Sequence, residues 1–513
     1  MRTRRLYALF GLLATLLGVA AGHFVASLLN PASSPVLAVG SAVIDLTPTP
    51  VKEWAIAQFG TKDKPILIGS VLLGVLGLAA VAGVVARRRF RDGAILLMAL
   101  VAVPVVAVLT RPTVEAPDLV PTVVTAVTGL GALWLLDSRA RGVPGTEGTE
   151  VPGVGGEAAA GPTRRGVVIA MGALAAAAAA LGGTGRWIQT YRARAENIDL
   201  PAAADAAPPL PRGLDDQVPG ITRWITPNED FYRVDTRLDT PVVDSEDWTL
   251  TIDGDVENEL TITFEELLEM PMIERNITLT CVSNSVGGEF VGGARWLGVP
   301  LQDLLDRAGV GKEADQILST DFDGMTISTP LALATDGRDA MICVGMNGEQ
   351  LPRAHGFPVR MDIPGLYGFI SATKWLTKLT LTTYEQQEAY WTERDWATDA
   401  PIKISARIDT PRALAKLEAG ENVVGGIAWC QHSGGVGTVE VQVDGGGWQP
   451  ATLGPDGGND YWRQWYYRWD AEPGQHSIAA RVTSGDGQVQ TAARATPFPE
   501  GASGIHQYTV TVS

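Results

Sequence analysis

Residues 352–376 read PRAHGFPVRMDIPGLYGFISATKWL, and this stretch guides the interpretation of the C-terminal half. Val359–Ile363 is predicted to be a buried or half-buried strand. His355, Arg360 and Lys374 lie around it, with glycines that let a backbone approach a ligand closely. Because arginine offers a bidentate fork to phosphate and lysine a point charge, the pattern favours an anionic ligand rich in hydrogen-bonding groups. The alternative is a strand with a satisfied core histidine and surface cations, and the residues alone leave both open.

The signals alternate between strand and helix from about Pro219 to Tyr384. Trp248–Asp253 and Leu376–Thr382 predict strands. Thr263-Phe-Glu-Glu266 has the spacing of a capping box, and the apolar positions of Leu301–Ala308 fall on one helical face. This order predicts a mixed α+β domain.

The pattern becomes all-β from about Pro401. Val439–Val443 and Ile478–Val482 alternate between apolar and polar residues, and each run leads into a glycine-rich turn. Short alternating strands over residues 399–513 predict an immunoglobulin-like β-sandwich.

Cys281 lies where an apolar strand, Ile277-Thr-Leu-Thr-Cys281, runs into a glycine-rich loop. A lone cysteine in such a strand is usually a small buried hydrophobe. Strand ends project into clefts, however, and a thiolate there would be a soft, strongly donating metal ligand. Cys343 and Cys430 read as core residues, and the sequence does not show whether they are close enough to pair.

The first 185 residues predict a bundle of transmembrane helices that anchors the chain. Five segments each approach the ~20 apolar residues that cross a bilayer, and none contains Asp, Glu, Lys or Arg. Val36–Leu46 is too short to span and is assigned to the membrane interface. The five predicted spans are Leu6–Leu29, Ile66–Ala86, Gly93–Leu109, Leu119–Leu136 and Gly166–Gly183.

Basic residues predict the orientation of this anchor. Arginines gather at the N-terminus, in residues 87–91 and in residues 139–165, which places these three regions in the cytoplasm. An odd number of spans then puts residues 186–513 on the extracytoplasmic side of a multi-pass plasma-membrane protein. Arg164-Arg165 before an alanine-rich core resembles a twin-arginine export signal, and a stop-transfer helix with a basic flank is the alternative.

Two low-complexity stretches separate these parts. Pro201–Pro211 is proline-rich, so residues 186–218 are predicted to be an extended, semi-rigid linker. Residues 138–165, rich in Gly, Thr and Glu, are predicted to be a flexible cytoplasmic loop.

Composition excludes several classes of function. Residues 186–513 carry 25 Lys and Arg against 47 Asp and Glu, a balance that repels nucleic acid, so no nucleic-acid partner is expected. Three cysteines without a CxxC pair argue against a zinc ribbon and against a cysteine-held iron–sulfur cluster. His23 is the only histidine in residues 1–185, so no membrane haem is expected in this chain.

Several blocks, in order, resemble the molybdopterin domain of the sulfite oxidase family. The all-β tail is similar to that family's C-terminal dimerisation domain, and the resemblance runs from about Ile221 to the C-terminus. It implies a molybdopterin-binding oxidoreductase domain over residues 219–398 and a dimerisation domain over residues 399–513. The blocks of the molybdopterin domain are the Cys281 loop, His355–Arg360, Pro364-Gly365 and Lys374-Trp375-Leu376, and those of the all-β tail are Val424–Trp429 and Val443–Trp448.

The resemblance implies a molybdenum–pyranopterin cofactor whose metal is also bound by a protein thiolate. Cys281 matches this ligand position and is the expected catalytic residue and metal ligand. A further cofactor contact is expected near Thr320–Asp323. The other expected cofactor-binding residues are Tyr232, Arg233, His355, Arg360, Gly368, Phe369, Ile370, Ser371 and Lys374.

The departures from the family concern the substrate. Sulfite-oxidising members have a paired arginine shortly after the ligand cysteine, whereas here no cation follows Cys281 until Arg295. The N-terminal segment reads Arg233-Val-Asp-Thr236 and lacks the family's Arg–Asn–His run. A neutral substrate such as a sulfoxide therefore fits at least as well as sulfite.

These observations predict a membrane-anchored, extracytoplasmic oxidoreductase that carries out two-electron oxo transfer on a small or sulfur-containing substrate. Its electron partner would be a separate protein or a quinone-linked chain, and the resemblance implies a homodimer. One alternative is a sulfite dehydrogenase whose rearranged cationic pocket uses Arg233 or Arg295. Another is a binding or receptor module without a cofactor.

Overall fold

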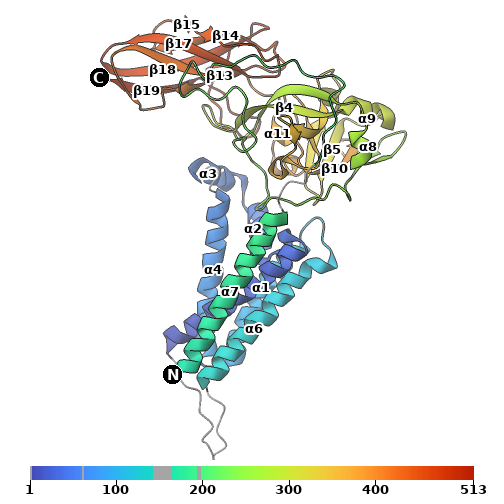
Figure 1. Cartoon of the computed structure of the whole chain (residues 1–513), viewed down its shortest axis with the longest axis vertical. Coiled ribbons are helices and arrows are strands. Elements are labelled where there is room, and N and C mark those ends of the chain that lie inside the picture. The colour runs from blue at the N-terminus through green and yellow to red at the C-terminus, as the bar shows by residue number, and fades with distance from the viewer. Residues whose placement is uncertain (1–2, 60–62, 142–163, 193–197) are drawn as a thin grey trace, which may run out of the picture. The chain divides into compact units, whose positions relative to one another are not determined.

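The computed structural model describes residues 3–59, 63–141, 164–192 and 198–513 (Figure 1). The chain divides into two compact units. One comprises Met1–Arg194 with Asp235–Val242, and the other comprises Ala195–Val234 with Val243–Ser513. The predicted cytoplasmic loop falls mostly on residues 142–163, which lie outside the described residues.

The first unit is helical. By length and composition, five helices in the described residues are apolar enough to cross a membrane, and each contains most or all of one predicted span. The existence of these helices is therefore confirmed, whereas their crossing of a membrane stays a prediction. The long helices are α1 (Arg4–Leu28), α4 (Asp63–Ala86), α5 (Phe90–Leu109), α6 (Val120–Arg141) and α7 (Arg164–Arg192); the shorter ones are α2 (Pro35–Leu46) and α3 (Thr49–Phe59).

Glycines bring helix α1 into close contact with α4 and α6. A Cβ atom on Gly11 would lie 2.0 Å from the carbonyl oxygen of Ala79, and one on Gly18 would lie 2.7 Å from that of Thr125. Small residues at such contacts let helix backbones approach each other, which is the usual way that helices pack in lipid.

Residues Asp235–Val242 pack with the helices, although they follow the segment expected to bind cofactor. Lys64 Nζ donates to Asp235 Oδ1 at 2.8 Å, and the Leu238 side chain occupies the space where a Cβ atom of Gly40 would lie.

The predicted linker differs from the structure at both of its ends. Helix α7 continues to Arg192 because residues 186–192 contain neither glycine nor proline. Further on, Asp205 forms a parallel bridge with Ile273, and Leu214 N donates to Gln464 Oε1 at 2.6 Å. These contacts hold the stretch within the second unit, so it is not a free spacer.

Two sheets build the α+β part of the second unit. The first has the strand order β2-β1-β10-β5-β6, in which β1 and β10 are parallel. The second has the order β3-β4-β7-β8, and β9 also pairs with β7. The first sheet contains β1 (Thr249–Gly254), β2 (Leu260–Thr263), β5 (Gln316–Asp321), β6 (Thr326–Pro330) and β10 (Leu376–Thr382); the second contains β3 (Ile273–Thr280), β4 (Val291–Pro300), β7 (Met341–Met346), β8 (Glu349–Gln350) and β9 (Arg360–Asp362).

Short helices join these strands, and their ends follow the sequence signals. The Thr263–Glu266 capping box is present at the start of α8 (Phe264–Leu268). Helix α9 (Leu301–Ala308) buries Leu301, Leu304, Leu305 and Ala308 and ends at Gly309, whose φ of 69° is left-handed. Helices α10 (Leu331–Ala334) and α11 (Gly368–Ser371) are each one turn long.

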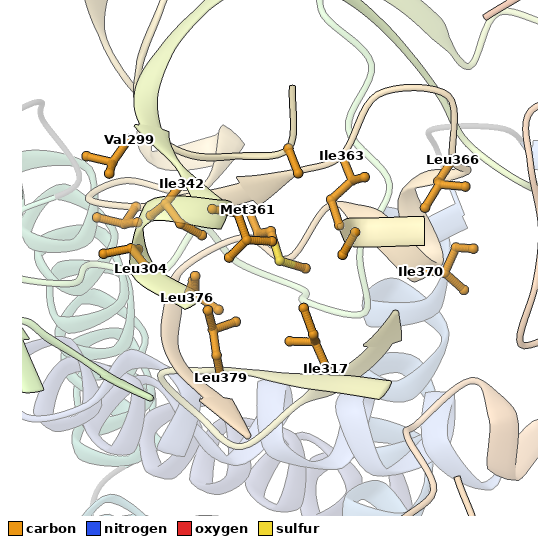
Figure 2. Close-up of a cluster of buried hydrophobic side chains, with 14 of the residues drawn as sticks. Val299, Leu304, Ile317, Ile342, Met361, Ile363, Leu366, Ile370, Leu376 and Leu379 are labelled. Atoms are coloured by element: carbon orange, nitrogen blue, oxygen red, sulfur yellow. The ribbon is translucent and has the colours of Figure 1, made fainter. Parts of the chain in front are cut away.

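The core of this part lies between the two sheets. Figure 2 shows side chains from both sheets and from α9 and α11 converging on one cluster, with Met361 of β9 near its middle. Val359–Ile363, predicted as a buried or half-buried strand, contains β9 and is fully buried. This buried strand positions Arg360 and Asp362.

Residues 405–512 form two further sheets around a shared core. Their strand orders are β11-β13-β17-β16 and β12-β19-β18-β14-β15. Buried side chains from both sheets, among them Trp465 and Val482, form one cluster. The strands are β11 (Ser405–Thr410), β12 (Lys416–Leu417), β13 (Gly420–Trp429), β14 (Val436–Val443), β15 (Gln449–Pro450), β16 (Thr452–Leu453), β17 (Arg463–Ala471), β18 (Gly474–Ser484) and β19 (His506–Val512).

Candidate active site

Cys281 directly follows strand β3, as the sequence predicts, and is half-buried. Its backbone N–H donates to Phe290 O at 3.0 Å, which closes the loop after the strand. Its Sγ lies 2.9 Å from Ser283 Oγ. Burial raises the pKa of the Cys281 thiol, while the Ser283 hydrogen bond and then the charge of Lys374 lower it. The thiolate therefore needs a positive partner, such as a metal ion, to form at neutral pH.

An extended segment, residues 226–234, runs beside this sheet. Thr226 N donates to Gly293 O at 2.8 Å, and Asn347 Nδ2 donates to Thr226 O at 2.9 Å. Asn228 O lies 2.9 Å from His355 Nε2. These bonds fix the segment between β4 and the 352–360 region. They therefore also hold Phe231 and Tyr232, which lie further along the segment.

Tyr232 lies next to the end of β3. A Cβ atom on Gly368 would be 4.0 Å from Tyr232 Oη and 3.9 Å from Thr280 O, so α11 begins at the same place. Tyr232 stacks on Phe231 with ring centroids 5.2 Å apart. Burial, and secondly the nearby Cys281 sulfur, raise the pKa of Tyr232, which stays a neutral hydrogen-bonding group.

Gly356 brings His355, Arg360 and Lys374 together. Its φ of 116° is in the left-handed region, and a Cβ atom there would lie 3.0 Å from Lys374 Cα and 3.1 Å from Arg360 Cβ. Lys374 Nζ lies 3.4 Å from Val234 O, at the end of the extended segment. The structure therefore joins two blocks that are separate in the sequence.

His355 is a neutral residue among cations. Burial lowers its pKa to about 4, and the charges of Arg360, Lys374 and Arg233 act in the same direction. Because the imidazole is neutral, Nε2–H donates to Asn228 O and Nδ1 remains an acceptor. A concentration of three positive side chains within a strongly acidic part of the chain favours an anion.

Asp362 is a member of this site that the sequence reasoning missed. Arg360 Nη2 lies 2.6 Å from Asp362 Oδ1, and both side chains are almost fully buried. Burial raises the pKa of Asp362 to about 6 against the opposing effect of Arg360. Arg360 and Asp362 are two residues apart on one strand, so their side chains share a face. This spacing in the sequence could have indicated the pair.

Four residues of helix α11, Gly368–Ser371, are expected to contact the cofactor. The side chains of the last three are engaged elsewhere, so these residues have only backbone groups to offer a ligand. Phe369 packs on Trp396 with ring centroids 5.6 Å apart, and Ile370 belongs to the core. Ser371 Oγ donates to Leu366 O and Tyr367 O, both at 3.1 Å. Side-chain contacts from Phe369, Ile370 and Ser371 to a cofactor would require these packing interactions to break.

The turn expected to add a contact lies beside this block. Asp321 Oδ1 accepts hydrogen bonds from Asp323 N at 2.8 Å and Met325 N at 3.0 Å, which shapes the turn after β5. Phe322 N donates to Trp375 O at 3.0 Å, so the turn is adjacent to the residue that follows Lys374.

Residues 237–391 match the family described as "Oxidoreductase molybdopterin binding domain". Mitochondrial sulfite oxidase of Homo sapiens is 30% identical over 308 residues, covering 50% of this chain and 55% of that protein. Residues 237–391 thus match a molybdopterin-binding oxidoreductase domain, and the chain is similar to sulfite oxidases over about half of its length. It spans about half the length of the sulfite oxidases that it matches.

Two further proteins are similar to this chain. Nitrate reductase [NADH] 2 of Nicotiana tabacum is 28% identical over 284 residues, which cover 43% of this chain and 30% of that protein. The crystal structure of the sulfane dehydrogenase SoxCD from Paracoccus pantotrophus aligns with a TM-score of 0.50 and 22% identity, covering 57% of this chain and 82% of that one. This likeness shows a shared fold.

The site fits the cofactor that binds to this family. Among the described residues, no group of three His, Cys, Asp or Glu side chains surrounds a metal position, so a metal at Cys281 would need most of its ligands from the cofactor. The Thr280 hydroxyl, beside Cys281, is buried and has no hydrogen-bond partner among the described residues. The Cys281 thiol suits a metal that is otherwise bound by sulfur, and the nearby cations suit an anionic phosphate. The Thr280 hydroxyl offers a further donor to a bound group.

Arg295 lies apart from the candidate ligands. It pairs in register with Asn276, near the middle of β3, whereas Cys281 follows the far end of that strand. Its Nε donates to Asn276 Oδ1 at 3.0 Å, its Nη1 lies 3.5 Å from Glu274 Oε2, and its Nη2 donates to Pro208 O at 2.7 Å.

The two remaining cysteines are free, buried thiols. Cys343 lies on β7 with its Sγ 3.6 Å from Asp362 Oδ2, and Cys430 directly follows β13. The pairing question that the sequence left open is answered: the two do not form a disulfide.

Proposed function

We propose that this chain is a membrane-anchored, extracytoplasmic molybdenum–pyranopterin oxidoreductase that carries out two-electron oxo transfer on a neutral, sulfur-containing substrate. The observation that carries the proposal is the placement of the Cys281 thiol at a strand end beside Tyr232 and Gly368, within the electrostatic influence of Lys374.

The side chains divide into two roles in this proposal. Cys281 binds the metal through its thiolate, and Ser283 stabilises that thiolate by donating a hydrogen bond over 2.9 Å. Arg233, Arg360 and Lys374 bind the phosphate of the pterin, and neutral His355 offers Nδ1 to a pterin N–H donor. Gly368 and its neighbours contribute backbone groups. The bound cofactor supplies the two-electron oxo-transfer chemistry.

A neutral substrate is favoured by where the cations lie. Arg295 is committed to Glu274 and Asn276, and Arg233 acts on His355 on the phosphate side. Val282-Ser-Asn-Ser-Val286 follows Cys281 without a cation. Substrate oxygen would therefore meet hydroxyl, amide and backbone donors, which suits a sulfoxide better than the sulfite dianion.

The proposal also assigns a role to each other part of the chain. Residues 1–185 anchor it in the plasma membrane, residues 219–398 bind the cofactor, and residues 399–513 form an immunoglobulin-like domain that pairs two copies. The arginine-rich loops predict that residues 186–513 face outward, and Arg164-Arg165 is consistent with twin-arginine export. Electrons pass to or from a separate protein or a quinone-linked chain.

Metal analysis of the full chain in detergent, purified from a host that makes molybdopterin, tests the proposal. We expect about one molybdenum and one pterin per chain in the wild type, and loss of most of the metal in Cys281→Ala. Cys430→Ala, which removes a buried thiol outside the site, is the matched control and should retain both. Folded wild-type protein without molybdenum would overturn the enzyme proposal and favour the binding module.

A further inference from the structure

A cavity of about 190 Å³ lies within the helical unit. Its walls come from α1, α2, α4, α5 and α6 and are almost entirely apolar. Leu78 and Val103, which line it, are 57% and 51% exposed on the helices, so the cavity wall reaches the outer surface of the bundle. In a membrane, a lipid-soluble molecule would enter from that side.

Two polar groups that lack their usual partner in the described part of the chain interrupt this apolar lining, whereas the hydroxyl of Thr125, which also lines the cavity, donates to Pro121 O at 2.9 Å. The Thr15 hydroxyl is buried and has no hydrogen-bond partner among the described residues. Pro104 lies inside α5 and has no N–H, so the carbonyl oxygen of Leu100 lacks its usual helical donor. Thr15, Leu100 and Pro104 all line the cavity. The two residues Thr15 and Leu100 thus bring a hydroxyl and a carbonyl group without their usual partners to an otherwise apolar cavity.

The size of the cavity restricts what it binds. An apolar cavity of about 150 Å³ is enough for benzene. The cavity here therefore accepts a single ring, and its two polar groups suit a ring that carries oxygen substituents. A saturated acyl chain would leave both polar groups without partners, which is costly in an apolar medium.

We propose that this cavity binds the ring of a membrane quinone, with the hydroxyl of Thr15 donating to a quinone oxygen and Leu100 O accepting from the quinol hydroxyl. The apolar tail of the quinone would leave past Leu78 and Val103 into the bilayer. The bundle would then be a binding site for an electron carrier as well as an anchor.

This inference rests on the proposed function for its role, though its test does not. Oxidation of a substrate by addition of a water oxygen releases two electrons and two protons, and a quinone that takes up both pairs becomes the quinol. In the reverse direction the quinol loses two electrons and two protons while the oxygen leaves as water. The electron count of the two reactions is the same.

Photolabelling tests the binding site directly. The full chain, in nanodiscs of quinone-free phosphatidylcholine, is labelled with an azido-benzoquinone that carries a decyl tail, and peptides are mapped by mass spectrometry. We expect labelling of α1, α5 and α6 that excess decylubiquinone prevents. Ala126→Phe, which fills the cavity, should reduce the competable labelling at least tenfold.

Isosteric variants keep the test informative if Ala126→Phe fails to fold. Thr15→Val should weaken decylubiquinone competition about fivefold, the value of one hydrogen bond. Thr128→Val is the control, because Thr128 Oγ1 bonds to Val124 O and does not line the cavity. Cys281→Ala should label like the wild type, which separates this result from any failure of molybdenum binding.

Three results would each overturn the proposal. They are labelling that decylubiquinone does not prevent, equal labelling of all variants, and a cavity that yields only phospholipid.

Discussion

Arg360 and Asp362 form a buried ion pair on a single three-residue strand, with Arg360 Nη2 2.6 Å from Asp362 Oδ1. The guanidinium also donates to His355 O at 3.0 Å and lies 4.7 Å from the centre of the Trp296 ring. Asp362 thus fixes the position of a cation that the proposed function assigns to the pterin phosphate.

Replacing Asp362 by asparagine should destabilise the cofactor-free chain by about 3 kcal/mol, because Arg360 would become a buried charge without a counter-ion. A bound phosphate would supply that counter-charge. The loss in thermal midpoint should therefore be smaller in molybdopterin-loaded protein than in protein from a host without the cofactor. Equal losses in both preparations would mean that Arg360 does not face the phosphate.

Lys374 should contribute to cofactor retention more than any nearby lysine. Lys374→Met removes a charge that approaches the end of the 226–234 segment, and we expect pterin dissociation to become about tenfold faster. Lys378→Met is the matched control: Lys378 pairs with Asp253 on the exposed side of the same region. Release of the fluorescent pterin after dilution measures both rates, and identical rates would remove Lys374 from the site.

Arg295→Ala separates the neutral-substrate proposal from the sulfite alternative. Because Arg295 is bound to Glu274 and Asn276, we expect the rate of substrate-dependent dye reduction to stay within about twofold of wild type, with some loss of stability. Arg233→Ala should instead reduce cofactor content. If sulfite supports turnover and Arg295→Ala abolishes it, a rearranged cationic pocket is the correct account.

His506 should make the second unit sensitive to acid. Its Nδ1 accepts from Ile408 N at 3.0 Å, and burial, followed by the charge of Arg407, lowers its pKa to about 4. The unfolded chain binds a proton at this histidine below its pKa of about 6.5, whereas the folded chain does so only near pH 4. The contribution of His506 to stability is therefore fully present above about pH 6.5 and is lost as the pH falls from there to about 4.

The variant His506→Gln should lose about 2 kcal/mol less stability than wild type between pH 7 and pH 4.5, measured as thermal midpoints. His476→Gln gives the opposite sign, because its hydrogen bond to Asp444 raises the pKa of His476 and its contribution declines as pH rises. Parallel pH profiles for wild type and His506→Gln would contradict the assignment.

The sequence predicted the elements wherever a local rule sufficed. The capping box at Thr263, the apolar face of α9 and the limits of β10 all depend on neighbouring residues. The position of Cys281 at a strand end followed from the change between apolar and glycine-rich sequence. The five long helices followed from length and composition, although α3 and the extension of α7 to Arg192 did not.

Long-range contacts were outside the reach of this reasoning. The pairing of β7 with β9 brings Asp362 next to Cys343, and neither residue alone signals that contact. The sequence of residues 198–218 indicates a free spacer, whereas in the structure Asp205 pairs with Ile273. Phe369, Ile370 and Ser371 match a family position, yet only the fold shows that their side chains belong to the core and to local hydrogen bonds.

Molybdenum X-ray absorption of the full chain tests the central claim most directly, because it counts the sulfur atoms bound to the metal. The account predicts that Cys281→Ser protein which retains metal shows one sulfur ligand fewer than wild type, while Cys430→Ser shows the same number. An unchanged sulfur count in Cys281→Ser would contradict the assignment of Cys281 as the metal ligand.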